Sequence, residues 1–175
     1  WMITAGGALF ASFPHVYATL FSGFYMALFL MLAVLIMRGV AFEFRSKSAN
    51  RTWRKVFDYC IFIGSIVPAL LWGVTVGNLI QGTPIDETMT YVGTFWDLLS
   101  PYTVLCGIAF VLVFTYHGGL FTSIKTAGPI SERARAASLV TGVPTAIGVI
   151  ILIIASYVCT DLYSSILATI FCALA

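Results

Sequence analysis

Long apolar runs separated by short charged stretches dominate the hydrophobic pattern of this chain. Four runs contain no Asp, Glu, Lys or Arg, and each is long enough for a helix that crosses a bilayer, which needs roughly 20 residues. These runs cover residues 17–37, 59–80, 102–124 and 136–160. Short segments of alternating polarity, which are typical of membrane β-barrels, do not occur. The pattern predicts an all-α polytopic transmembrane helix bundle with four full spans and partial apolar segments at both ends.

Both ends of the chain indicate an internal piece of a longer membrane protein. The sequence opens on Trp1 inside one uncharged run and stops inside another. The opening has neither the basic start nor the cleavage-site pattern of a signal peptide. We therefore expect a single membrane-domain fragment over residues 1–175, with no role assigned to the tail at 161–175.

The charged residues predict the orientation of the four spans. Six of the nine Lys and Arg residues lie between residues 38 and 55, and the other three lie in 125–135. The stretch 81–101 contains three acidic residues and no basic one. Basic residues in short loops mark the cytoplasmic side of a membrane. We therefore expect 38–55 and 125–135 to be cytoplasmic loops and 81–101 to be an outer loop.

Composition excludes the other common explanation for a basic cluster. The chain is 60% hydrophobic and 9% charged, whereas soluble proteins are about 25% charged. A nucleic-acid interface is therefore not expected for residues 38–55, and membrane lipid is the expected surrounding. The cluster is interpreted mainly as a topology signal.

Asp58 and Arg38 are the candidate functional residues, as parts of a proton path or of an interface between helices. A carboxylate close to bilayer depth is costly and often marks a proton or ion route. The alternative is that Asp58 lies at the interface and pairs with Arg54, one helical turn earlier. Arg38, at the end of the first span, could extend to the headgroups or pair with Asp58 across the neighbouring helix. Such a pair would hold two spans in register.

No catalytic or metal site is expected from the remaining polar residues. His15 and His117 are predicted on opposite faces of the membrane, where they could not ligate one haem iron. The cysteines lie singly in apolar stretches without metal-ligand or disulfide spacing; they are Cys60, Cys106, Cys159 and Cys172. His117, within a span, is therefore interpreted as a packing residue, and the cysteines as small apolar ones.

Gly73 and Gly77 have the GxxxG spacing that lets transmembrane helices approach closely. Asn78 and Gln81 follow them in the segment GVTVGNLIQG. Close helix packing is the simpler interpretation of this segment. A contact of Asn78 or Gln81 with a quinone headgroup is the functional alternative, which the spacing alone does not support.

Several motifs resemble subunit II of the cytochrome bd-type quinol oxidases in order and spacing. They are WMITAGGALFASFPHVYATLFSGFY, RGVAFEFRSK and WRKVFDYCIFIGSIVPALLWGVTVGNLIQGTP. The likeness is close over residues 1–84 and weaker through LLSPYTVLCGIAF and YHGGLFTSIKTAGPISERAR. Beyond about residue 140 it is little more than hydrophobicity.

This resemblance implies a haem-free subunit of a two-subunit terminal oxidase in the prokaryotic cytoplasmic membrane. Such complexes oxidise quinol and reduce oxygen to water, with protons taken from the cytoplasmic side. The resemblance places haems b and d in the partner, subunit I, and gives subunit II a role in assembly and proton access. Arg38 and Asp58 match functionally sensitive positions of the family. No catalytic residue is expected in this chain itself.

The resemblance also has a gap. The acidic residues of the family that are most tied to the proton path lie upstream of Trp1. The proton route, the quinone type, the oxygen affinity and the binding of a structural quinone therefore stay open. A secondary transporter unrelated to respiration is the alternative function. It would place a substrate site at midplane around broken helices, and the Gly and Pro residues of the second and fourth spans are its only support.

Overall fold

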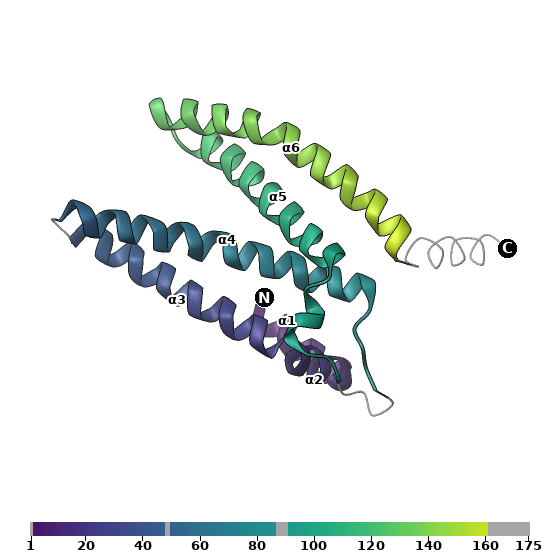
Figure 1. Cartoon of the computed structure of the whole chain (residues 1–175). Coiled ribbons are helices and arrows are strands. Elements are labelled where there is room, and N and C mark those ends of the chain that lie inside the picture. The colour runs from purple at the N-terminus through teal and green to yellow at the C-terminus, as the bar shows by residue number, and fades with distance from the viewer. Residues whose placement is uncertain (1, 48–49, 87–90, 161–175) are drawn as a thin grey trace. The chain divides into compact units, whose positions relative to one another are not determined.

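The structure is a computed structural model that describes residues 2–47, 50–86 and 91–160 (Figure 1). Trp1, Cys172 and the predicted apolar tail at 161–175 lie outside the described residues. The elements are α1 (Met2–Ser12), α2 (Pro14–Gly23), α3 (Tyr25–Lys47), α4 (Arg51–Gln81), the 3-10 helix η1 (Phe95–Leu98), α5 (Pro101–Lys125) and α6 (Pro129–Cys159). Apart from one isolated bridge between Ile85 and Tyr91, regular structure in the described residues is helical. The all-α prediction is confirmed.

Four helices, α3 to α6, are long and apolar enough to cross a membrane. Their bounds differ from the predicted spans at the start of the first span and within both predicted cytoplasmic loops. The first predicted span, 17–37, joined parts of two helices, because α2 ends at Gly23 and α3 begins only at Tyr25. The change of direction falls at Phe24, whose backbone leaves the helical conformation at φ −95° and ψ 12°.

The predicted loops are also shorter than expected. Most of 38–55 is helical, because α3 continues to Lys47 and α4 begins at Arg51. Likewise, α6 begins at Pro129, inside the predicted loop 125–135. Arg, Lys and Glu are good helix formers. The charged residues therefore mark the end of the apolar part of each helix, and the helix itself continues beyond it.

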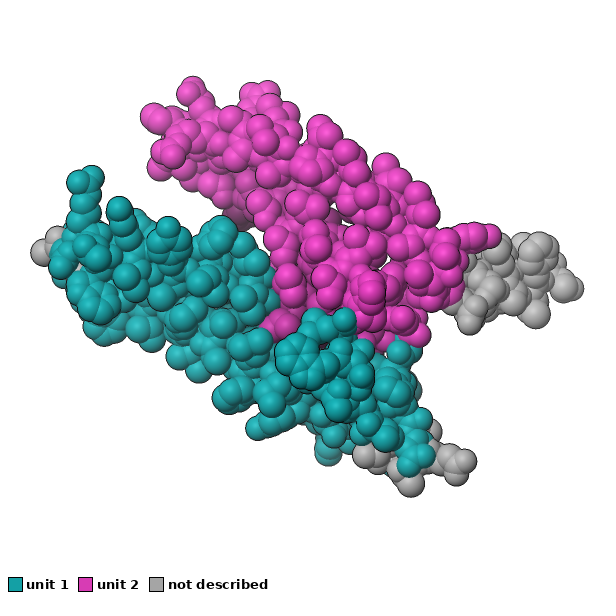
Figure 2. Space-filling model, in the orientation of Figure 1, with its two compact units in different colours: residues 1–68, 82–99 teal, residues 69–81, 100–175 magenta. Residues whose placement is uncertain are grey.

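The chain forms two compact units, which Figure 2 shows in teal and magenta. Unit 1 comprises Trp1–Pro68 and Gly82–Leu99, and unit 2 comprises Ala69–Gln81 and Ser100–Ala175. The division falls within α4 at Pro68, which has no N–H group for the helix ladder. The first part of α4 thus belongs to unit 1 and its second part to unit 2.

In unit 1, α3 and the first part of α4 form a closely packed antiparallel hairpin. Gly64 lies directly against α3: a Cβ atom at Gly64 would lie 2.6 Å from Cβ of Arg38 and 2.8 Å from the carbonyl oxygen of Val34. Only a residue without a side chain allows the two backbones to come so close. This approach fixes the register of the hairpin.

The segment that follows α4 is organised by Tyr91 and by a short capped turn, both in unit 1. The ring of Tyr91 packs against Gly23 of α2, and its hydroxyl donates to the carbonyl oxygen of Thr94 at 3.0 Å. One carboxylate oxygen of Asp97 accepts from the backbone N–H of Thr94 at 2.7 Å and from its hydroxyl at 2.8 Å. Together with the buried Leu98, these bonds fold the turn η1.

The Asp97 turn is expected to loosen in acid. The N–H and hydroxyl of Thr94 stabilise the charged carboxylate, so the pKa of Asp97 is lowered. The stabilisation is present above the pKa of an unfolded Asp, about 3.9, and is lost as the pH falls through the lower folded pKa. Protection of the Asp97 and Leu99 amides from hydrogen exchange, taken relative to the intrinsic exchange rate at each pH, should therefore fall below about pH 4 in the full-length protein. The Asp97→Asn variant should lack this dependence, and an unchanged profile in that variant would contradict the assignment.

In unit 2, the second part of α4 packs against α5 through its glycines. A Cβ atom at Gly73 would lie 2.6 Å from both the carbonyl oxygen of Cys106 and Cα of Gly107. At Gly77 it would lie 3.0 Å from Cβ and Sγ of Cys106. The predicted packing role of this GxxxG pair is confirmed, and Cys106 is the small buried residue that receives it.

The helices α5 and α6 of unit 2 pair along their length as an antiparallel hairpin. The buried hydroxyls of Tyr102 and Ser156 are hydrogen-bonded at 2.8 Å near one end. At the other end, near the turn between the helices, Ser131 Oγ donates to the carbonyl oxygen of Ser123 at 2.7 Å. Thr145, next to Pro144, donates to Thr141 O at 2.7 Å within α6. Hydroxyl bonds of this kind satisfy polar groups where water is scarce.

Candidate functional site

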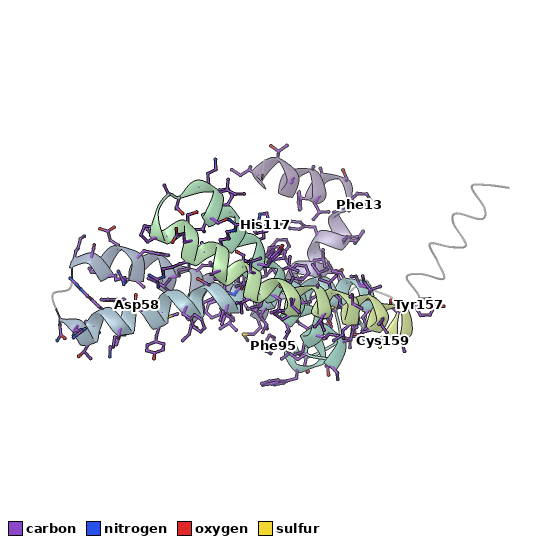
Figure 3. All side chains as sticks on the ribbon, turned by 90° about the horizontal axis from the view of Figure 1, so that it is seen from above. Phe13, Asp58, Phe95, His117, Tyr157 and Cys159 are labelled. Atoms are coloured by element: carbon purple, nitrogen blue, oxygen red, sulfur yellow. The ribbon has the colours of Figure 1, made fainter. Side chains whose placement is uncertain are left out.

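A charged contact between two helices lies near the turn of the α3–α4 hairpin in unit 1. Arg45, in the last turns of α3, donates from Nε to Oδ1 of Asp58 at 2.5 Å and from Nη2 to Oδ2 at 3.4 Å. Asp58 stands two turns into α4, at the position labelled in Figure 3. Both side chains are about half exposed, at 50% and 51%. The contact is a forked, charge-assisted pair between two neighbouring helices.

The structure pairs Asp58 with Arg45, a partner that was not predicted. Arg38 does not pair with Asp58: its guanidinium lies over the ring of Phe42, 5.5 Å from the centroid. The side chain that holds Asp58 is Arg45. Arg45 and Arg38 are seven residues apart and thus lie on the same face of α3. Arg45 is simply closer to the end of the hairpin, where Asp58 lies.

Sequence reasoning missed Arg45 because it ended the first span at residue 37. A helix that continues through the charged residues places Arg45 on α3 opposite the second turn of α4. The seven-residue spacing of Arg38 and Arg45 could have identified Arg45, because it places both residues on the face of α3 that meets α4. Arg38 still contributes to this face, because its side-chain stem contacts Gly64.

A groove of about 440 Å³ runs beside the pair along α4. Its lining residues are Lys55, Asp58, Tyr59 and Phe62. Helical periodicity brings positions three and four apart onto one side of a helix, which accounts for the shared orientation of these four residues. The groove combines a cation, a carboxylate and two aromatic rings.

The histidines are separate from this pair. His15 lies in the first turn of α2, and His117 is exposed on α5 (Figure 3). They belong to different units, and each stands alone on its helix. Within residues 2–47, 50–86 and 91–160, no group of three or more His, Cys, Asp or Glu could hold a metal ion. The described cysteines, Cys60, Cys106 and Cys159, are free thiols.

The polar residues at the end of α4 have partners within unit 2. The buried Asn78 donates from Nδ2 to the carbonyl oxygen of Val74 at 2.8 Å. Gln81 accepts from the hydroxyl of Ser100 at 2.8 Å, and this bond ties the end of α4 to the start of α5. These contacts favour helix packing over ligand recognition for both residues.

The chemistry available at the Arg45–Asp58 pair is acid–base chemistry. A carboxylate can accept and release a proton, and a guanidinium holds it in place while staying charged. Neither side chain can carry electrons. The site is therefore suited to position charge or to pass protons at the edge of an apolar helix pair.

Comparison with known proteins shows which family the chain belongs to. Residues 1–175 match the family model described as cytochrome bd terminal oxidase subunit II. The chain belongs to this family. Membership and the four apolar helices make it part of an integral membrane protein. Family membership also means that the Gly and Pro residues of the second and fourth spans no longer support a transporter unrelated to respiration.

Three relatives show what share of a subunit II sequence this chain matches. The chain is 44% identical over 155 residues to a Haemophilus influenzae protein named probable cytochrome oxidase subunit 2, covering 86% of this chain and 41% of that protein. It is 46% identical over 149 residues to cytochrome bd-I ubiquinol oxidase subunit 2 of Escherichia coli K12, covering 83% and 39%. It is 40% identical over 135 residues to cytochrome bd ubiquinol oxidase subunit 2 of Bacillus subtilis, covering 77% and 40%. The matches thus span about two fifths of these subunits.

Proposed function

We propose that this chain is part of the haem-free subunit II of a two-subunit terminal oxidase that oxidises quinol and reduces oxygen to water. The match over all 175 residues to the subunit II family carries this proposal. The names of the relatives from Escherichia coli and Bacillus subtilis, both ubiquinol oxidase subunits, support the reaction. The partner is subunit I, which holds haems b and d, and the substrate is a quinol. The complex resides in the prokaryotic cytoplasmic membrane.

The charge distribution supports a cytoplasmic location for the Arg45–Asp58 end of unit 1. Residues 38–55 contain six of the nine basic residues, and the turn between α5 and α6 lies in the other basic stretch, 125–135. Both stretches then face the cytoplasm, and residues 81–101 face the opposite side. On this topology Asp58 lies on the side from which an oxidase takes up protons.

In this arrangement Asp58 acts at the mouth of a proton route, and Arg45 positions it. A half-exposed carboxylate at the start of an apolar helix is accessible to water and adjacent to the interior. Arg38, two turns before Arg45 on α3, supports the same contact between α3 and α4 by packing against Gly64. Neither residue needs to touch haem or quinol.

The proposed function is tested by purification of the full-length subunit through an affinity tag. We expect a larger partner with haem absorbance to purify with it, and the preparation to consume oxygen when quinol is supplied. A matched preparation from cells that lack this subunit should lose haem from the membrane fraction and lose quinol-dependent oxygen uptake. A full-length protein that purifies alone, without haem, and moves a solute across vesicles would overturn the proposal.

A further inference from the structure

The groove beside Asp58 combines opposite charges at one end with aromatic side chains along its length. Lys55 and Asp58 contribute the charges, and Tyr59 and Phe62 form the apolar wall. The two aromatic side chains are 67% and 61% exposed on α4. An exposed aromatic wall next to fixed charges is typical of the boundary between lipid headgroups and acyl chains.

The charges of this groove are available to a ligand. Asp58 pairs with Arg45 and Glu43 with Lys47, and among the described residues no carboxylate is seen to pair with Lys55. Arg45 holds Oδ1 of Asp58 closely, whereas Oδ2 is 3.4 Å from Nη2. A carboxylate has about four acceptor positions, so this second oxygen can accept another donor. The groove therefore offers a cation for a phosphate and an acceptor for an ammonium group.

The groove also lies at the right depth for a phospholipid. Residues 51–58 of α4 contain four charged side chains, and the run from Tyr59 to Ile80 contains none. The groove crosses this change from polar to apolar sequence. Its charged end is thus at headgroup level and its aromatic wall at acyl-chain level.

We propose that this groove binds a phospholipid with a primary ammonium headgroup, such as phosphatidylethanolamine. The phosphate binds Nζ of Lys55, the ammonium group donates to Oδ2 of Asp58, and one acyl chain lies along Tyr59 and Phe62. An anionic phosphatidylglycerol headgroup would bind Lys55 but bring no cation to Asp58. Phosphatidylcholine would bring a cation without N–H donors, and would lose the hydrogen bond.

Lipid binding to the full-length subunit in its native complex tests this proposal. The complex is stripped of lipid in detergent and then titrated with phosphatidylethanolamine, phosphatidylglycerol or phosphatidylcholine, and bound lipid is counted by native mass spectrometry. We expect phosphatidylethanolamine to be retained most strongly. Lys55→Met should weaken its retention about tenfold, as expected for the loss of one hydrogen bond to a charged group. Asp58→Asn should reduce the preference for phosphatidylethanolamine over phosphatidylcholine.

Matched variants keep the test decisive. Arg51→Met removes a positive charge one turn earlier on the same helix, outside the groove lining, and should leave retention unchanged. If Asp58→Asn does not assemble, Lys55→Glu replaces it: the reversed charge repels the phosphate and should abolish retention. Equal retention of phosphatidylglycerol and phosphatidylethanolamine, or full retention by the Lys55→Met complex, would overturn the proposal.

Discussion

Asp58→Asn is expected to lower quinol-dependent oxygen consumption by roughly a hundredfold, within the range that positioned proton-transfer groups contribute. The asparagine keeps the shape of the side chain and can still bond to Arg45, but it cannot carry a proton. The haem absorbance of the purified complex should stay close to that of the unchanged protein. Oxygen uptake per haem is therefore the measurement that isolates this effect from assembly.

A charge exchange separates proton transfer from helix pairing. The double variant Arg45→Asp with Asp58→Arg restores an ion pair between α3 and α4 but moves the carboxylate to the other helix. We expect each single charge reversal to lower haem content, because two like charges then face each other. The double variant should recover haem content, and its turnover should stay about as low as that of Asp58→Asn.

The Glu43–Lys47 pair provides a matched control in the same helix. Its atoms are 2.7 Å apart on the exposed surface of α3, and exposed pairs of this kind contribute little. Glu43→Gln should leave both haem content and turnover unchanged. If the exchanged pair restores turnover together with haem content, then the contact is purely structural and Asp58 does not pass protons.

Gly73→Val is expected to destabilise the packing of α4 against α5 by about 3 kcal/mol, at the upper end of typical overpacking costs. The new Cβ atom would lie 2.6 Å from two backbone atoms of α5, the carbonyl oxygen of Cys106 and Cα of Gly107. Backbone cannot rotate away as a flexible side chain does, so the helices must separate. Unfolding of the full-length subunit in mixed detergent micelles measures the loss.

Gly118→Val is the matched control for this prediction. Gly118 lies on α5, and a Cβ atom there would meet nothing within 4 Å. The two substitutions share the same change in helix propensity, so their difference reports packing alone. Equal stability of both variants would show that α4 and α5 do not depend on the close approach at Gly73.

The sequence identified the features that follow from periodicity and composition. Four apolar runs predicted four long helices, and the GxxxG spacing predicted the face of Gly73 and Gly77 that meets another helix. It could not determine where the helices end, because lysine and arginine are good helix formers and a helix can continue through them beyond the edge of the bilayer. That single error hid Arg45. The partner of Asp58 depends on the register of two helices, which Gly64 sets through a contact visible only in three dimensions.

The two halves of α4 pack against different helices, α3 before it in the chain and α5 after it. Chains emerge from the ribosome with their N-terminal part first. The hairpin of α3 with the first part of α4 can close as soon as Gly64 has entered the membrane. The second part of α4 then carries its glycine face without a neighbour until Cys106 and Gly107 of α5 arrive. A nascent chain that stops between these points leaves the faces of Gly73 and Gly77 without their partner helix.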